Sequence, residues 1–135
     1  MPGYSPNPLW KKLGYKPGLI VFVHRAPPAY RAELALPTDF PVHWVRRPAA
    51  GAPFIHTFVR EFAELSRLVA AYRPLLAPTG VLWISWPKQS AGVPTDLTEN
   101  RVRDVALPLG LVDIKVCAVD ATWSALKFVI RKTLR

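Results

Sequence analysis

The sequence predicts an α/β domain built on a mainly parallel sheet that ends in an antiparallel hairpin. The chain has 135 residues, about the size of one domain, and 50% of them are apolar, enough to form a core. Short apolar runs alternate with a segment of helical period, which is typical of strands joined by helices. The chain ends in apolar runs joined by a tight turn. We therefore expect a single domain over residues 1–135, with residues 1–18 packed on it as a helix and a turn.

The first elements follow from local signals. In "NPLWKKLG" a helix is predicted with Asn7 as its N-cap, Pro8 at its first position and Gly14 as its terminator. The following "YKPG" has the residues of a type II turn. It leads into "LIVFVH", residues 19–24, whose continuous apolar run predicts a strand buried on both faces.

The middle of the chain alternates strands and helices. A short helix is expected before Pro37, a second strand in "VHWVRR" and a third in "FIHTFV". From Glu61 the period changes to that of a helix, and "VLWISW" then predicts a fourth buried strand. The apolar face of the helix consists of Phe62, Leu65, Val69, Tyr72 and Leu76.

The last third predicts a helix and a hairpin. Thr98 is expected to cap a helix in which Leu97 and Val102 form a hydrophobic staple, with Gly110 as its end. The segments "LVDIKVCAV" and "SALKFVIRK" should pair as antiparallel strands. The buried face of the helix is predicted to continue through Val105, Ala106 and Leu109.

Composition narrows the classes of function. The net charge is +9, and residues 1–60 hold eight Lys or Arg against two acids, so the N-terminal half should attract anions. No apolar run is long enough to cross a membrane and the start does not resemble a signal peptide, so a cytoplasmic protein without membrane contact is expected. The single cysteine, Cys117, is interpreted as a buried apolar residue. His24, His43 and His56 lack metal-ligand spacing, so no metal is predicted.

The segment "LSRLVAAYRPLLAPTGVLWISW", residues 65–86, resembles the helix, turn and fourth strand of class I methyltransferases. This resemblance implies a Rossmann-like fold with methyltransferase-like topology. It also implies S-adenosylmethionine bound by a glycine-rich loop after the first strand and an acidic residue after the second. Here no glycine lies between Gly18 and Gly51, and the second strand ends in Arg46 and Arg47. A glycine loop lets the backbone approach the ligand, so we expect no bound cofactor.

Longer motifs resemble a bacterial family of domains of unknown function. They are "GYSPNPLWKKLGYKPG" and the segment from "GVLWISWPKQS" to "LKFVIRK", which includes the W-K-K-L-G and S-W-P-K motifs. That resemblance supports the fold class and implies no activity.

Candidate binding residues follow the predicted strands. Ligands of open parallel sheets bind beyond the carboxyl ends of the strands, so these segments should share one edge and a pocket. Lys88, with hydroxyls and backbone amides of its loop, has the donors to hold a phosphate or carboxylate. The alternative is that Lys88 is solvated, Asp96 or Thr98 caps the next helix and Gly92 turns the chain. The candidates are His24, Arg25, Arg46, Arg47, Ser85, Trp86, Lys88, Ser90, Gly92, Thr95 and Asp96.

The sequence leaves three functions open. The first is a non-catalytic binding or interaction module for an anionic small molecule or protein partner. The second is an enzyme acting on a phosphorylated or nucleotide-like substrate, with His24, Lys88 and Asp96 as its reactive groups. The third is an RNA-binding protein that uses the basic N-terminal half, including Lys11 and Lys12. The oligomeric state is not predicted.

Overall fold

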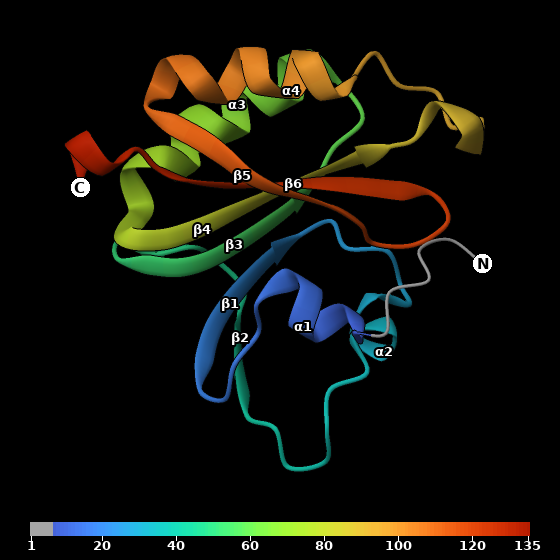
Figure 1. Ribbon diagram of the computed structural model, residues 1–135, viewed down its shortest axis with the longest axis vertical. Coiled ribbons are helices and arrows are strands. Elements are labelled where there is room, and N and C mark those ends of the chain that lie inside the picture. Colours follow the sequence, from blue (N-terminus) through green and yellow to red (C-terminus); the bar gives the residue numbers. More distant parts are fainter. Residues whose placement is uncertain (1–6) are drawn as a thin grey trace.

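A computed structural model of the chain describes residues 7–135 as one six-stranded sheet with helices on both faces (Figure 1). Residues 1–6, part of the predicted N-terminal segment, lie outside the described residues. The strands are β1 (Leu19–His24), β2 (Val42–Val45), β3 (Ala52–Phe58), β4 (Leu76–Pro87), β5 (Leu111–Ala118) and β6 (Trp123–Ile130). The helices are α1 (Leu9–Leu13), α2 (Tyr30–Leu34), α3 (Phe62–Tyr72) and α4 (Glu99–Ala106). Short 3-10 turns cover Arg73–Leu75, Gln89–Ala91, Leu107–Leu109 and Lys132–Leu134.

The sheet has the order β2-β1-β3-β4-β6-β5. Strands β2, β1, β3 and β4 run parallel, and β6 pairs antiparallel with both β4 and β5. The predicted mainly parallel sheet with a C-terminal hairpin is therefore confirmed. Because the chain leaves β1 toward β2 and leaves β3 toward β4, a topological switch point lies between the carboxyl ends of β1 and β3.

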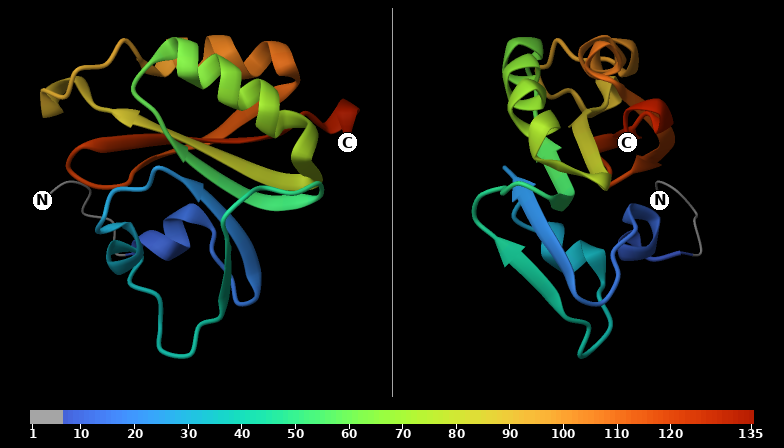
Figure 2. Two further views of the ribbon diagram at one scale, coloured as in Figure 1. Left: turned by 180° about the vertical axis from the view of Figure 1, so that it is seen from behind. Right: turned by 90° about the vertical axis from the view of Figure 1, so that its left-hand side faces the viewer.

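The two faces of the sheet carry different helices. Figure 2 shows α1 and α2 on one face and α3 and α4 on the other. Helix α1 buries Leu9 and Leu13, and the Trp83 indole N–H donates to the Leu13 carbonyl at 2.9 Å, which joins this helix to the central strand. At the end of α1, Gly14 has a φ of 88°, a left-handed conformation that glycine adopts without steric cost.

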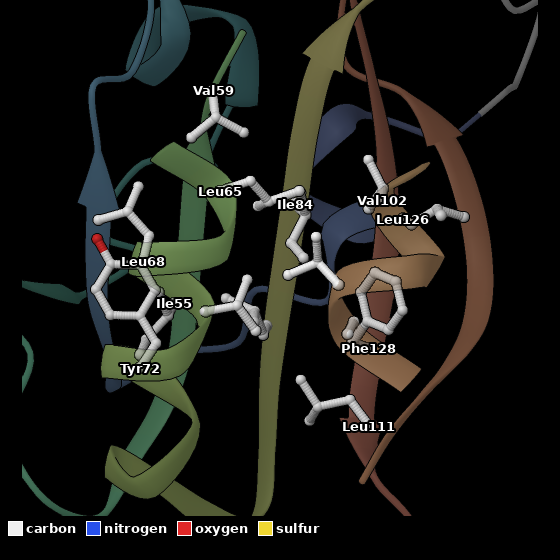
Figure 3. Close-up of a cluster of buried hydrophobic side chains, with 14 of the residues drawn as sticks. Ile55, Val59, Leu65, Leu68, Tyr72, Ile84, Val102, Leu111, Leu126 and Phe128 are labelled. Atoms are coloured by element: carbon white, nitrogen blue, oxygen red, sulfur yellow. The ribbon is translucent and has the colours of Figure 1, made fainter. Parts of the chain in front are cut away.

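The larger core lies between the sheet and the pair α3 and α4 (Figure 3). Leu65 from α3 and Val102 from α4 point toward Ile84 of β4 and Phe128 of β6, and all four side chains are fully buried. Thr98 caps α4 by accepting a hydrogen bond from the Arg101 backbone N–H at 3.2 Å, as predicted. None of the helices in residues 7–135 has the length and apolarity to span a membrane.

Several predicted details are wrong at the level of single residues. The N-cap of α1 is Pro8 rather than Asn7. Leu76 begins β4 instead of continuing α3, because Pro74 at the start of a 3-10 turn removes the backbone N–H that a longer helix would use. Leu109 is exposed because α4 tightens into a 3-10 turn after Ala106 and its apolar face rotates away from the core.

The prediction that β1 is buried on both faces is also wrong. Leu19 and Val21 are buried under α1 and α2, but Ile20 on the opposite face is 47% exposed. The neighbouring Val45 of β2 is 39% exposed. The reason is the connection from β2 to β3, residues 46–51, which crosses the sheet without forming a helix. In Figure 2 (right) no helix of the described chain lies over β2 on the α3 side.

Candidate functional site

The carboxyl ends of the parallel strands border clefts that lie at separate places along one edge of the sheet. The β1–β2 cleft has a volume of about 320 Å³ and lies where these two strands end. The switch-point cleft, about 190 Å³, lies beyond β3 and contains Arg25, Arg60, Glu64 and Trp123. The loop cleft, about 400 Å³, is formed by Arg60, Glu61 and residues 94–96. Of the predicted binding residues, Arg25 borders the switch-point cleft, Thr95 and Asp96 border the loop cleft, and none borders the β1–β2 cleft.

The β1–β2 cleft is built around a stacked arginine. The Arg31 guanidinium of α2 lies 4.0 Å from the centre of the Trp44 ring of β2, a cation–π contact. Tyr30, which is buried, also borders the cleft. The remaining walls are largely apolar and consist of Val23, Ala26, Pro27, Pro28 and Val45.

The segments around the β1–β2 cleft carry positive charge only. Residues 23–31 and 44–47 contain Arg25, Arg31, Arg46 and Arg47 and no acidic residue. Arg25 forms an ion pair with Glu64, with its Nη1 3.2 Å from Oε2. Within residues 7–135 the other three arginines take part in no ion pair. The cleft therefore lies in a field that favours an anion.

The switch-point cleft, by contrast, contains an acidic side chain, Glu64, beside Arg25 and Arg60. Glu64 accepts Arg25 and also lies 3.9 Å from Arg67, so a single carboxylate faces both guanidinium groups. The wall consists of Phe58 and Trp123, whose rings meet edge to face at 5.1 Å. Arg60 pairs with no acid within residues 7–135, but it does not stack on an aromatic ring as Arg31 does, and Glu64 places a negative charge in the same cleft.

The side chain of His24, at the end of β1, is fixed by contacts within the protein. Its Nδ1 lies 2.9 Å from the Thr57 hydroxyl, and its ring lies edge-on to Tyr72 at 6.5 Å. Burial lowers the pKa of His24 and outweighs the opposite effect of Glu64. The imidazole is therefore neutral at pH 7 and adds no charge to the edge.

The polar groups of the loop after β4 make contacts within the protein. The Thr95 hydroxyl donates to the Arg60 carbonyl at 2.6 Å, and Asp96 accepts the Phe62 backbone N–H at 2.7 Å, which caps α3. Lys88 donates to the Asp120 carbonyl at 3.2 Å. Gly92 turns the chain with a φ of 70°, and Ser90 is exposed. The helix-capping and turning alternative thus describes Thr98 and Gly92, whereas Asp96 caps α3 instead of the following helix and Lys88 contacts the Asp120 carbonyl.

Ser85 and Trp86 lie inside the protein. Trp86 belongs to the core under α3 and α4. Ser85 is fully buried on the other face, with its hydroxyl 2.6 Å from the His56 Nε2. The His56 Nδ1 lies 2.8 Å from the Tyr30 hydroxyl, which in turn lies 2.7 Å from that of Tyr15. The hydrogen bonds of this network can all point in either direction, and in both cases every group keeps a hydrogen-bond partner.

This buried hydrogen-bond network resembles a serine nucleophile with a histidine base, but a substrate cannot reach it. His56 and Ser85 have no exposed surface, so a substrate cannot reach the serine hydroxyl. Burial lowers the pKa of His56 to about 3, which keeps the imidazole neutral. The network therefore joins α2 to the centre of the sheet and has a structural role.

The remaining reactive groups do not gather into a site. Cys117 is buried, and its burial raises the pKa of the thiol, which disfavours the nucleophilic thiolate. In the part of the chain that the structure describes, no group of three or more His, Cys, Asp or Glu side chains is arranged to hold a metal ion.

Arg31 and Trp44 were missed as binding residues from the sequence. Arg31 lies in a short helix rather than at a strand end, and Trp44 lies inside β2 rather than after it. The signal that would have found them is alternation along β2, which places Trp44 on the same face as Val42, toward α2.

The residues after β1 and β2 do not fit S-adenosylmethionine. The turn after β1 contains Pro27 and Pro28, which donate no backbone N–H, and no glycine. Arg25 has a φ of 56° and is tied to Glu64, and this ion pair crosses the switch point. Where the second strand would present an acid to the ribose hydroxyls, the chain has Arg46 and Arg47.

Comparison with solved structures shows what this chain is similar to. A SAM-dependent methyltransferase from Aquifex aeolicus matches 89% of this chain and 87% of its own, with a TM-score of 0.65 and 16% identity. A protein from Pyrococcus horikoshii matches 92% and 87%, with a TM-score of 0.61 and 10% identity. LepI in complex with SAH and a substrate analogue matches 91% of this chain, which spans 39% of the LepI chain, with a TM-score of 0.55 and 16% identity.

These similarities show the fold. The chain has a Rossmann-like, methyltransferase-like fold. At identities of 16% or less they carry no activity over to this chain. No protein-family model and no curated protein matches the sequence.

Proposed function

We propose that this protein is a non-catalytic binding module that holds a small anionic ligand in the β1–β2 cleft. The observation that carries the proposal is Arg31, whose guanidinium lies on the Trp44 ring in the wall of the cleft and pairs with no carboxylate within residues 7–135. The cleft lies beyond the carboxyl ends of parallel strands, where ligands of such sheets bind.

The stacking on Trp44 prepares Arg31 for this role. A guanidinium lying over an aromatic ring loses part of its rotational freedom before binding, while the N–H groups at its edge remain available. Its planar fork matches the oxygens of a phosphate or carboxylate, and charge-assisted hydrogen bonds of this kind are about twice as strong as neutral ones. Arg46, at the end of the same strand, adds long-range attraction.

The walls of the cleft indicate the rest of the ligand. Pro27, Pro28 and Val23 add apolar side chains to the same cleft as the arginine. A volume of about 320 Å³ suits a small molecule. The combination fits a phosphate or carboxylate carried on a compact organic body, such as a phosphorylated metabolite or a nucleoside monophosphate.

A binding role is favoured over catalysis because each of the predicted reactive groups contacts a different part of the protein. His24 contacts Thr57, Lys88 contacts the Asp120 carbonyl, and Asp96 caps α3. None of these three lines the β1–β2 cleft. A reaction needs groups that converge on one substrate, and here the convergent group is Arg31 alone.

Isothermal titration calorimetry with pyrophosphate, AMP, citrate and S-adenosylmethionine tests the proposal. We expect at least one of the three anions to bind, and S-adenosylmethionine to give no heat. Arg31→Gln should abolish anion binding. Arg131→Gln, which removes an exposed arginine after β6 at the other end of the sheet, is the matched control and should leave it unchanged.

Three results would count against the proposal. One is that no anion binds, and another is that Arg31→Gln binds as the wild type does. The third is tighter binding of a single-stranded RNA oligonucleotide through Arg46 and Arg47, with a steep salt dependence, which would favour the RNA-binding function instead.

A further inference from the structure

The α3 side of β1 and β2, called here the bare face, contains an apolar groove. Ile20 and Phe22 of β1 form its floor together with Val45 of β2, and the crossing segment with Pro48 forms one wall. The groove has a volume of about 120 Å³ and is almost entirely apolar, with Arg47 at its rim. A cavity of about this size accepts a benzene-sized group, so the groove can take a single large apolar side chain.

An uncovered face is unusual for a sheet of this type. Parallel strands are normally buried on both faces because their crossover helices cover them. Here α1 and α2 cover one side of β1 and β2, while the segment of residues 46–51 replaces a helix on the other. Figure 2 (right) shows α3 over the neighbouring part of the sheet and no helix over β2 on that side. On this side the segment of residues 46–51 borders the groove beside β1.

The charge of the rim distinguishes between possible occupants. Arg46 and Arg47 follow β2 directly and form no ion pair within the described part of the chain. Two copies of the chain joined through this face would bring four such arginines together, on molecules that each carry a net charge of +9. An acidic partner gains from the same charges. The surface therefore fits a helix with an apolar stripe bordered by Asp or Glu.

We propose that the bare face binds an acidic amphipathic helix of a partner protein. One apolar side chain of that helix enters the groove between Ile20 and Val45, and a carboxylate beside it pairs with Arg47. The bound helix occupies the place of the missing crossover helix. Ile20 lies on the opposite face of the sheet from Trp44, but the groove and the β1–β2 cleft share Val45, so the anion affinity of the Val45→Asp variant is measured beside its peptide affinity.

A displayed peptide library tests this inference with the full chain. A library of random helix-forming peptides about 15 residues long is selected on the wild-type protein and depleted on the Val45→Asp variant. We expect enriched peptides to share apolar residues at helical spacing and an excess of Asp and Glu. Calorimetry should then show that Val45→Asp weakens their binding by at least about tenfold, because it places a carboxylate in the apolar groove.

Matched variants separate this face from other apolar surface. Arg47→Glu, at an exposed position, should also weaken binding and should shift a new selection toward basic peptides. Val116→Asp, at a 59% exposed position on edge strand β5, should have no effect. The inference is overturned if the enriched peptides show no acidic excess or bind the Val45→Asp variant equally well. It is also overturned if sedimentation shows a dimer that Val45→Asp dissociates, which would make a second copy the occupant.

Discussion

The two halves of the sheet use their side chains differently. In the half formed by β3, β4, β6 and β5, the larger core is buried between the sheet and the helices α3 and α4, and polar groups such as Ser85 and Asp96 have partners within the protein. The exposed apolar residues of this half, Ile114 and Val116, lie on the edge strand β5. In the half formed by β1 and β2, Ile20 is exposed and Arg31 and Arg47 pair with no acid in residues 7–135. The first half supplies stability, and the second presents surface that an external molecule can use.

The difference arises from the length of the connections. From β3 to β4 the chain inserts α3, an amphipathic helix of eleven residues that covers the sheet. From β2 to β3 it inserts only residues 46–51, too few for a helix that could cover the strands. Shortening one crossover thus leaves apolar surface and positive charge side by side. The following predictions test the division, from the largest expected effect to the smallest.

The largest contrast should come from two isoleucines. Ile84→Ala deletes a fully buried side chain at the centre of the larger core and should lower the free energy of unfolding by about 2–5 kcal/mol. Ile20→Ala, at the exposed position on the bare face, should cost less than about 1 kcal/mol. Urea unfolding at pH 7 measures both. Equal losses would show that the two halves are equally well packed and would remove the comparison.

The buried imidazole should make the protein sensitive to acid. The pKa of His56 is about 3 in the folded chain and about 6.5 when unfolded, so between these values the unfolded state binds the proton. Stability therefore falls as the pH falls from about 6.5 toward 3, and His56 alone should cost about 2 kcal/mol between pH 7 and pH 5. Urea unfolding at the two pH values measures the loss.

Variants assign this acid sensitivity to one histidine. His56→Gln should be less stable at pH 7, because it disturbs the contacts with Tyr30 and Ser85, but it should lose less stability on acidification than the wild type. His24→Gln should reduce the pH dependence less, since His24 is only partly buried and its pKa is lowered less strongly. An unchanged pH dependence in His56→Gln would show that His56 is already accessible to protons.

The sequence predicted the sheet well because the signals for its elements are local. Apolar runs and turn residues identified every strand, and Thr98 identified the cap of α4. The burial of β1 on both faces was not predictable in this way, since Ile20 has the same apolar neighbours in sequence as Val21. The two residues differ in burial because the connection after β2, residues 46–51, forms no helix over Ile20. Whether a six-residue connection leaves a face uncovered depends on how the whole sheet is assembled.

The candidate site was predicted less well because it depends on tertiary contacts. Strand order placed His24, Arg46 and Lys88 at the same edge, but the sequence does not show which polar groups find partners inside the protein. Asp96 caps α3, which begins 34 residues earlier in the chain, rather than the helix that follows it. Arg31 comes to the β1–β2 cleft only because α2 packs against Trp44.

A smaller effect on stability is expected from Asp96. Asp96→Ala removes the acceptor for the Phe62 backbone N–H and should lower the free energy of unfolding by about 1 kcal/mol, as the loss of a helix N-cap does. Thr98→Ala, which removes the cap of α4, should cost a similar amount. Both variants should bind the anion identified by calorimetry with unchanged affinity. A marked loss of affinity in Asp96→Ala would instead place the ligand in the loop cleft.

The smallest change in stability is expected where binding depends most on one side chain. Arg31→Gln removes a cation–π contact near the surface, which contributes about 0.5–1 kcal/mol, and breaks no ion pair of the described chain. The melting temperature without ligand should therefore stay close to that of the wild type, while the rise produced by the anion disappears. Arg31→Lys keeps the charge but loses the planar fork, so it should restore only part of that rise. Full restoration by lysine would show that charge alone holds the ligand and that the geometry on Trp44 is unimportant.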